Sequence, residues 1–166
     1  MVIDKTSRRS IAIHEAGHAV AAVILNLPRG GVTIEPEGED LGYAIVGDPI
    51  SQWERGDGPR RPLVEDHCVS LYSGWAAEKV LLGSTTVGSS ADFEKARSCI
   101  TNIGVRGASF VGDDIWERYE NKLQLRAIQL VKMHRTKIEK VAERLMDQVS
   151  LTADEVEQVC TDMDFT

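Results

Sequence analysis

The sequence lacks any apolar run long enough to cross a membrane. Its longest, "AVAAVIL" at residues 19–25, falls far short of the roughly 20 residues that a membrane-spanning helix needs. The first ten residues, "MVIDKTSRRS", contain no apolar core of a secretion signal. Cysteine is also scarce: Cys68, Cys99 and Cys160 are scattered and odd in number, which favours reduced thiols over a disulfide framework. We therefore expect a cytoplasmic protein that does not bind a membrane.

A dense run of basic residues is absent as well. The chain has 19 Lys and Arg against 26 Asp and Glu, and its formal net charge is −7. Because binding to a phosphate backbone relies on clustered Lys and Arg, we expect no nucleic-acid partner. Internal repeats and low-complexity tracts are missing, and 166 residues is a length typical of one domain. We expect a single domain over residues 1–166.

Helical patterns dominate what is present. Helices are expected over residues 7–26, 62–82, 90–106 and 114–148. The last of these is long enough to be bent or broken within. Thr152 and Glu155 form a capping-box pattern that predicts one further short helix. The β-branched segments 32–36 and 42–47 predict a hairpin, and the Gly- and Pro-rich segment 47–62 predicts a loop. The expected fold class is mainly α (α+β), with one small β-hairpin.

Two histidines and a glutamate interrupt the first, otherwise apolar helix in the pattern H-E-x-x-H. His14 and His18 are four residues apart, so on a helix they share one face and two imidazole nitrogens can reach one ion. Glu15 is rotated about 100° from His14 around the helix axis. This rotation places its carboxylate beside a water at the metal, where it can take a proton and later return it. The spacing predicts two zinc ligands, His14 and His18, and one general base, Glu15.

A zinc site needs at least one more protein ligand, and the spacing does not identify it. Residue types that serve as ligands occur at His67, Cys68, Glu78, Asp92, Cys99 and His134. Each has an ordinary alternative role. Asp92 fits a capping box with Ser89 at a helix start, and Glu78 fits a surface glutamate. His67 and His134 lie in charged surroundings typical of solvated histidines, and the cysteines fit small core side chains.

Four segments, taken in order, resemble the peptidase domain of the FtsH-type, membrane-anchored AAA+ zinc proteases. "HEAGHAV" (14–20) resembles that family's metal helix, and "VTIEPEGEDLGYA" (32–44) resembles its strand, turn and second strand. "SGWAAEKVLLG" (73–83) is similar to its Gly-x-Ala-Ala-Glu-Glu helix, and "TTVGSSADFEKA" (85–96) to its Thr-Gly-Ala-Ser-Asn-Asp segment. The likeness covers about residues 10–106, and four ordered motifs are far more specific than one.

The resemblance implies roles that the spacing leaves open. It makes Asp92 the third zinc ligand and Glu78 a carboxylate that orients a ligand histidine. It also implies that a substrate peptide lies along the strand at Gly42, Tyr43 and Ala44. The implied fold is a helical, zincin-like peptidase domain, and the implied cofactor is Zn²⁺.

Several positions depart from the family pattern. No Walker-type G-x-x-x-x-G-K-[ST] motif occurs in the sequence, and we expect neither the family's ATPase module nor its membrane anchor. Trp75 and Lys79 stand where the family has Arg and a second Glu, and Ala91 stands where it has Asn.

The expected function is that of an ATP-independent zinc metallopeptidase that cleaves a peptide or an unfolded protein. The departures leave two alternatives: a catalytically silent interaction or scaffold protein, and a peptidase subunit that works with a separate ATPase in trans. The intact H-E-x-x-H pattern favours the enzyme, because a scaffold has no use for Glu15. A homo-oligomer is the habit of the family and is a further expectation for the assembly.

Overall fold

The computed structural model describes residues 5–38, 41–47, 61–85, 89–107 and 113–163. Within them the chain forms helices and one small sheet. The helices are α1 (Lys5–Ile24), α3 (Arg61–Leu81), α4 (Ser90–Gly107), α5 (Asp113–Met133), α6 (Arg135–Gln148) and α7 (Ala153–Asp162). The strands are β1 (Arg29–Thr33), β2 (Tyr43–Val46) and β3 (Ser150–Leu151). The expected mainly α class with a small β element is confirmed.

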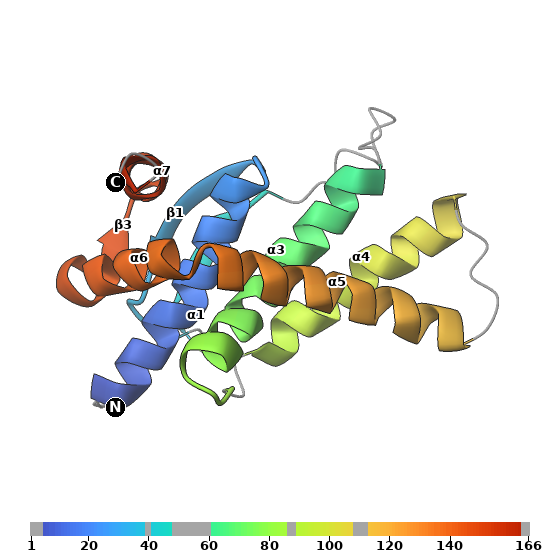
Figure 1. Ribbon diagram of the computed structural model, residues 1–166, viewed down its shortest axis with the longest axis horizontal. Coiled ribbons are helices and arrows are strands. Elements are labelled where there is room, and N and C mark those ends of the chain that lie inside the picture. The colour runs from blue at the N-terminus through green and yellow to red at the C-terminus, as the bar shows by residue number, and fades with distance from the viewer. Residues whose placement is uncertain (1–4, 39–40, 48–60, 86–88, 108–112, 164–166) are drawn as a thin grey trace.

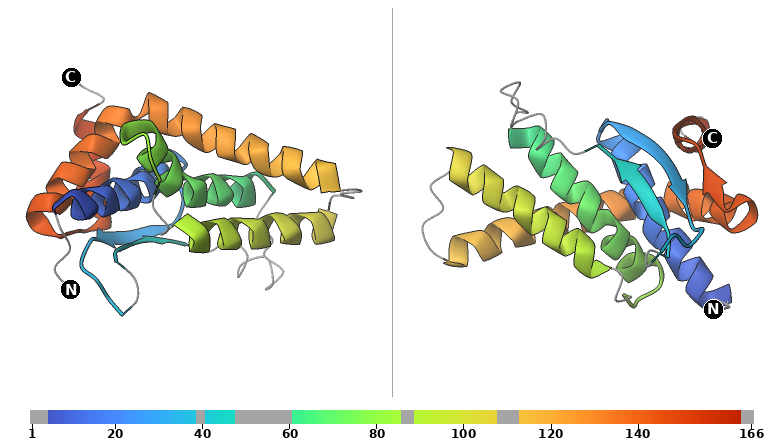
Figure 2. Two further views of the ribbon diagram at one scale, coloured as in Figure 1. Left: turned by 90° about the horizontal axis from the view of Figure 1, so that it is seen from below. Right: turned by 180° about the vertical axis from the view of Figure 1, so that it is seen from behind.

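The elements form three layers, with α1 and α3 in the middle (Figures 1 and 2). Helices α5 and α6 follow one another across one side of this middle layer, and the sheet and α4 lie on the opposite side. Helix α1 packs against α3, α6 and the sheet at once, and its residues 12–22 are all buried. This burial follows from the sequence, because alanines and branched aliphatics surround most of the helix.

The close approach of α1 and α3 depends on Gly17. A Cβ atom added at Gly17 would lie 2.5 Å from the Ser73 carbonyl oxygen and 2.8 Å from Ala77 Cβ. A side chain there would push the two helices apart, since the interior has no spare volume. Small residues on both helices therefore set the distance between α1 and α3.

The sheet has the order β2-β1-β3, and both pairings are antiparallel. The β1–β2 pair forms the expected hairpin, but its first strand is Arg29–Thr33 and not the expected 32–36. Val32 lies opposite Ala44 and pairs with Leu151 of β3 on its other side. The sequence did not predict β3, because two residues carry no strand pattern. A turn places it: Val149 ends α6 with φ 69°, and Ile34 N–H donates to the Val149 carbonyl oxygen at 2.9 Å.

Some element boundaries differ from the expected ones. Helix α1 ends at Ile24 rather than at residue 26, because Asn26 takes a left-handed conformation with φ 52°. The expected break within 114–148 is confirmed at His134, which separates α5 from α6. The expected loop over 47–62 lies mostly outside the described residues, and its last two residues belong to α3.

Two expectations drawn from composition can be compared with the structure. Within the described residues, no helix is both long and apolar enough to cross a membrane. Cys68, Cys99 and Cys160 are buried, and none of them forms a disulfide. All three pack in the core, which for Cys68 and Cys99 confirms the alternative interpretation as small core side chains.

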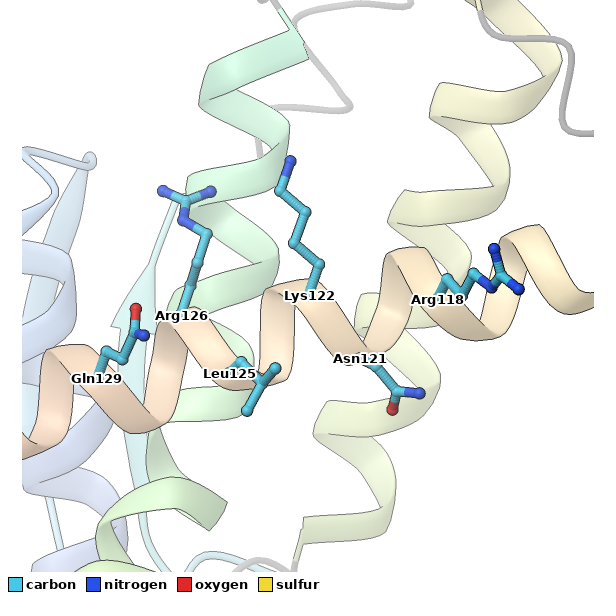
Figure 3. A pocket seen from close by; sticks show the side chains of 6 residues that line it. All are labelled: Arg118, Asn121, Lys122, Leu125, Arg126 and Gln129. Atoms are coloured by element: carbon cyan, nitrogen blue, oxygen red, sulfur yellow. The ribbon is translucent and has the colours of Figure 1, made fainter.

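A shallow hollow of about 420 Å³ lies along α5 (Figure 3). Its lining side chains all come from that helix: Arg118, Asn121, Lys122, Leu125, Arg126 and Gln129. Arg126 Nη2 donates to Asp66 Oδ1 at 2.6 Å, which ties this face of α5 to α3. None of the site residues expected from the sequence lines this hollow.

Replacing Thr152 by Ala tests the capping box at the start of α7. The box forms as expected: Glu155 N–H donates to Thr152 Oγ1 at 3.3 Å, and Thr152 N–H donates to Glu155 Oε2 at 2.8 Å. Loss of the Thr152 cap should lower the free energy of unfolding by about 1 kcal/mol, measured by urea denaturation. The matched control is Thr161→Ala on the same helix, which should have a smaller effect because Thr161 Oγ1 only donates back to the Glu157 carbonyl oxygen. Equal losses in the two variants would contradict a role for the cap.

Candidate metal centre

His14 and His18 lie on the buried face of α1 that meets α3. Their exposed fractions are 8% and 6%, and their Nε2 atoms are 3.0 Å apart. The two rings are steeply inclined, with an interplanar angle of 74°. The four-residue spacing on one helix therefore brings two imidazole nitrogens to one point.

The other nitrogen of each ring is held from α3. His14 Nδ1–H donates to Glu78 Oε1 at 2.5 Å, and His18 Nδ1–H donates to the Ser70 carbonyl oxygen at 2.8 Å. A carbonyl oxygen only accepts, so His18 Nδ1 carries a proton and its Nε2 can offer a lone pair. Glu78 is fully buried, so the alternative interpretation of a surface glutamate is wrong.

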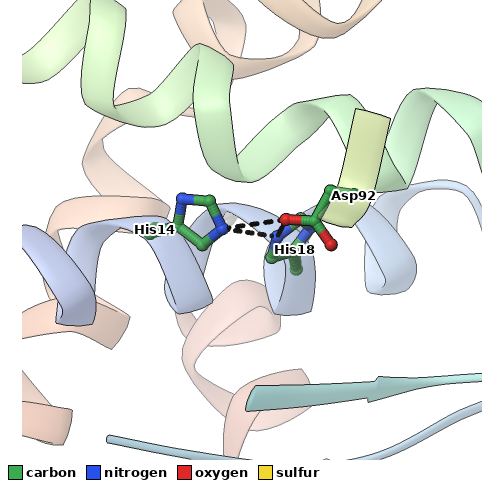
Figure 4. Close-up of side chains that lie close together, drawn as sticks. All are labelled: His14, His18 and Asp92. Atoms are coloured by element: carbon green, nitrogen blue, oxygen red, sulfur yellow. Dashed lines mark hydrogen bonds and ion pairs between the residues drawn. The ribbon is translucent and has the colours of Figure 1, made fainter. Parts of the chain in front are cut away.

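Asp92 reaches the two histidines from the first turn of α4 (Figure 4). Its Oδ2 lies 3.1 Å from His14 Nε2 and 3.2 Å from His18 Nε2. Among the described His, Cys, Asp and Glu side chains, these three form the one group of potential ligand atoms lying within 4.8 Å of one another. Two nitrogens and a carboxylate oxygen are donors that zinc accepts, and zinc sites with three such ligands keep a position for water.

Gly74 of α3 lies directly against the two imidazoles. A Cβ atom added at Gly74 would be 2.4 Å from His18 Nε2 and 2.7 Å from His14 Nε2. Any other residue would therefore fill the space beside these nitrogens. The donor set and this space together fit a metal ion.

Glu15 is buried where α1 meets the start of β2. Its exposed fraction is 8%, and its charge acts on the neighbouring His14. A Cβ atom added at Gly42, the residue before β2, would lie 3.2 Å from Glu15 Cγ. Two of the expected substrate-strand residues continue from there: Tyr43 is partly exposed on β2, and Ala44 pairs with Val32 of β1.

Carboxylates dominate the electrostatics of this centre. Burial by itself lowers the pKa of His14, but hydrogen bonds to Asp92 and Glu78 and the charge of Glu15 outweigh it and raise this pKa to about 10. Burial raises the pKa of Asp92, but its hydrogen bonds with His14 and His18 outweigh burial and hold this pKa well below its usual range. The carboxylates of Glu15, Glu78 and Asp92 thus favour a positive charge at the two imidazoles. Bound protons or a metal cation can supply that charge.

Two other histidines proposed as ligand candidates lie elsewhere. His67 was expected to be solvated, but its exposed fraction is only 6%, so that expectation is wrong. The reason is the helical period: His67 shares with Ser70 and Gly74 the face of α3 that meets α1. His67 Nδ1 has no hydrogen-bond partner among the described residues. His134 is partly buried at the break between α5 and α6.

The start of α4 also differs from its expected form. Ser89 was expected to cap this helix in a box with Asp92. The Ser89 hydroxyl is buried, and in the described part of the chain it has no hydrogen-bond partner, so this interpretation is wrong. The Asp92 carboxylate instead points to the histidines of α1.

Sequence reasoning missed two contributors to the centre. Ser70 acts through its backbone carbonyl, which leaves no trace in a pattern of side chains. Gly74 does leave a signal, because a glycine inside a helix costs about 1 kcal/mol relative to alanine and so points to a packing reason.

The sequence matches the model of a known protein family. The model of peptidase family M41 matches residues 1–110, a stretch that contains His14, Glu15, His18, Glu78 and Asp92. The match covers more than half of the chain.

Curated relatives are similar over most of the chain. It is 30% identical over 182 residues to "ATP-dependent zinc metalloprotease FtsH 3" of Sorangium cellulosum, and 30% over 192 residues to "ATP-dependent zinc metalloprotease FtsH" of Thermus thermophilus. It is 28% identical over 193 residues to "Mitochondrial inner membrane i-AAA protease supercomplex subunit YME1" of Saccharomyces cerevisiae. The alignments cover 96% of this chain but only 29%, 30% and 24% of the three relatives. The chain thus spans less than a third of the length of these relatives.

Gly74→Ala tests whether the space beside the imidazoles is needed to hold an ion. The added methyl group would occupy that space, so zinc affinity should fall about a hundredfold, measured by competition with a chromophoric chelator. The matched control is Ser73→Ala on the preceding residue, which removes a hydroxyl that donates to the Val69 carbonyl oxygen at 2.7 Å. The control should keep its zinc affinity. Unchanged affinity in Gly74→Ala would mean that zinc does not bind at this point.

Proposed function

The chain belongs to peptidase family M41, and from this premise we propose that it is a zinc-dependent peptidase whose metal is held by His14, His18 and Asp92. The observation that carries the proposal is the convergence of three potential ligand atoms within 4.8 Å of one another. Zinc is the metal named for the two FtsH relatives. The donor set of two imidazoles and a carboxylate is consistent with that metal.

The residues around the ligands would keep the ligands in place. Glu78 fixes the ring of His14 through Nδ1, and the Ser70 carbonyl fixes the ring of His18 in the same way. Both Nε2 atoms are thereby kept directed to one point, which is how outer carboxylates and carbonyls commonly support metal-binding histidines. Bound zinc supplies Lewis-acid polarisation of a peptide carbonyl and activation of a water molecule.

Glu15 would act as the general base and then as the acid. It takes a proton from the attacking water as the new C–O bond forms, and it passes that proton to the amide nitrogen as the C–N bond breaks. Its location beside His14 and close to Gly42 supports this role. The buried carboxylate also argues against the alternative of a silent scaffold, because burying Glu15 has a cost that scaffolding alone does not explain.

The substrate would bind in an extended conformation along β2. Among the described strands β2 is paired only with β1, so its other edge can accept a peptide as a further strand. The edge begins at Gly42 beside Glu15, and Tyr43 and Ala44 follow. Leu41, Tyr43 and Ile45 are large apolar side chains exposed at 45%, 39% and 53%. An extended peptide with apolar side chains, or an unfolded protein segment, suits this surface.

Peptide hydrolysis at such a centre consumes water and no nucleotide, so we propose that short peptides are cleaved without ATP. The names of the FtsH relatives describe ATP-dependent enzymes, and this chain spans less than a third of those proteins. ATP would then be needed only to unfold a folded substrate, through an ATPase in the same assembly. Size-exclusion chromatography, alone and with candidate ATPases, tests both a homo-oligomer and an ATPase partner acting in trans.

Glu15→Gln is the decisive variant for catalysis. It keeps the size of the side chain and removes the base, so cleavage of a diverse peptide pool by the zinc-loaded protein should fall by at least about a hundredfold. Zinc affinity should stay close to that of the unaltered protein, because Glu15 is not proposed as a ligand.

The matched control is Glu94→Gln, since Glu94 is an exposed carboxylate on α4 and should not affect cleavage. Cleavage that survives Glu15→Gln would exclude the proposed base. Zinc binding without any cleavage by the unaltered protein would favour the scaffold.

Zinc binding should release the proton that His14 Nε2 shares with Asp92. Because the pKa of His14 is raised to about 10, this proton is bound throughout the neutral range when zinc is absent. Protons therefore compete with zinc, and apparent affinity should rise with pH, by up to about tenfold per unit between about pH 6 and 9. Calorimetry in buffers of different ionisation enthalpy counts the released protons. An affinity independent of pH would contradict the raised pKa of His14 in the zinc-free protein.

A further inference from the structure

Asp92 and the two histidines come from helices that are joined through a third. Helices α1 and α4 each pack on α3, and they have little contact with one another. Figure 2 shows α4 beside α3, in the layer that also holds the sheet. The position of Asp92 relative to His14 and His18 is therefore set by how α4 is fixed on α3.

The first turn of α4 needs a restraint. Asp92 lies in that turn, and helix ends are where local unfolding begins. Ser89 does not supply a cap, because its buried hydroxyl has no hydrogen-bond partner in the described part of the chain. Among the described residues, Phe93 in this turn makes ring contacts with α3 that can hold it.

Two aromatic rings and two cationic side chains meet at this end of the α3–α4 interface. The rings of Trp75 and Phe93 meet edge to face, with centroids 5.5 Å apart and an interplanar angle of 86°. Lys79 Nζ lies 4.9 Å from the Trp75 ring centroid, and Arg97 Cζ lies 5.9 Å from that of Phe93. Each cation is four residues beyond its ring, so both helices contribute one cation–π pair. We call these four residues the aromatic clamp.

Each aromatic residue of the clamp is the sequence neighbour of a residue that lines the metal centre. Trp75 follows Gly74, whose backbone lies against both imidazoles, and Phe93 follows Asp92. Successive residues on a helix are rotated by about 100°. A Phe93 ring fixed against α3 therefore directs the Asp92 carboxylate past α3 toward the histidines.

We propose that Trp75 and Phe93 are positioning residues, whose ring contact holds the Asp92 carboxylate on His14 and His18 and thereby sets the affinity and geometry of the metal site. This inference rests on the proposed function, because it concerns the same ion. It assigns a role to Trp75 and Phe93 that the H-E-x-x-H pattern does not provide.

Burial separates the clamp from the ordinary core. Trp75 and Phe93 are only partly buried, and Lys79 and Arg97 are exposed, whereas Tyr72, which also contacts Phe93, is fully buried. Tyr72 thus fills the core, and its ring lies 4.9 Å from that of Phe93. The Trp75–Phe93 contact lies at the edge of the core, next to Asp92. There it buries less apolar surface than a core contact, and its edge-to-face geometry fixes the orientation of the Phe93 ring.

The test measures zinc affinity and the absorption spectrum of the Co²⁺ form for the full chain and four variants. Trp75→Ala removes the ring, Trp75→Phe keeps an aromatic ring, and Phe93→Leu keeps the apolar volume without the ring. Cys99→Ala is the matched control, because it trims the same helix pair two turns away, where Cys99 lies against Cys68. Circular dichroism and thermal unfolding report the folding of every variant.

Trp75→Ala and Phe93→Leu should weaken zinc binding by about tenfold or more and should change the intensity of the visible Co²⁺ bands. Trp75→Phe should restore most of the affinity and the original spectrum. Cys99→Ala should lower thermal stability and leave both metal readouts unchanged. If Trp75→Ala does not fold, Phe93→Leu carries the same expectation.

Four outcomes would overturn the inference. Unchanged affinity and spectrum in both ring-removing variants would leave the proposed function standing without the clamp. An equal loss in Cys99→Ala would show that general destabilisation weakens the site. Failure of the unaltered protein to bind one zinc ion, or binding that survives His14→Ala, would overturn the proposed function and the inference together.

Discussion

Charge buried between α1 and α3 is the constraint from which the rest of the structure follows. Glu78 is fully buried, and a carboxylate in an apolar interior is strongly unfavourable unless it is paired. Its partner is His14 Nδ1 on α1, 2.5 Å away, so the two helices are fixed in a single register. Gly17 lets the helices approach closely, and Gly74 leaves space beside the Nε2 atoms. The same interface therefore determines both the packing of the core and the shape of the centre.

The two outer layers, which pack on opposite sides of α1 and α3, contribute differently to the centre. On one side, the sheet brings Gly42 against Glu15, and α4 brings Asp92 to the histidines. On the other side, the described side chains of α5 and α6 contribute no ligand atom to the centre, and the two helices pack on the back of α1 and α3. The residues of the centre thus lie on one side of the middle layer and within it, while α5 and α6 on the opposite side add apolar packing that stabilises the fold.

How far the sequence predicts this arrangement depends on the range of the interaction. The helical period alone was enough to place His14 and His18 together, because both lie on one element. Asp92 was only one of six candidates until a family resemblance selected it, because the approach of α4 to α1 through α3 leaves no local pattern. His67 shows the opposite failure: its charged neighbours suggested exposure, but the face that it shares with Gly74 buries it. Strand β3 had no signal, since its two residues pair only through the turn after α6.

The pairing of β3 with β1 has a consequence for solubility. Strands with unpaired edges are templates for pairing between molecules, and proteins protect them by covering them or keeping them short. Here the two-residue β3 pairs with Val32 and Thr33 on the side of β1 that β2 leaves free, and α6 packs on the back of α1. A chain shortened to the matched region 1–110 would keep the side chains of the centre and lose both protections. We therefore expect the segment after residue 110 to protect residues 1–110, which contain the metal centre, from aggregation.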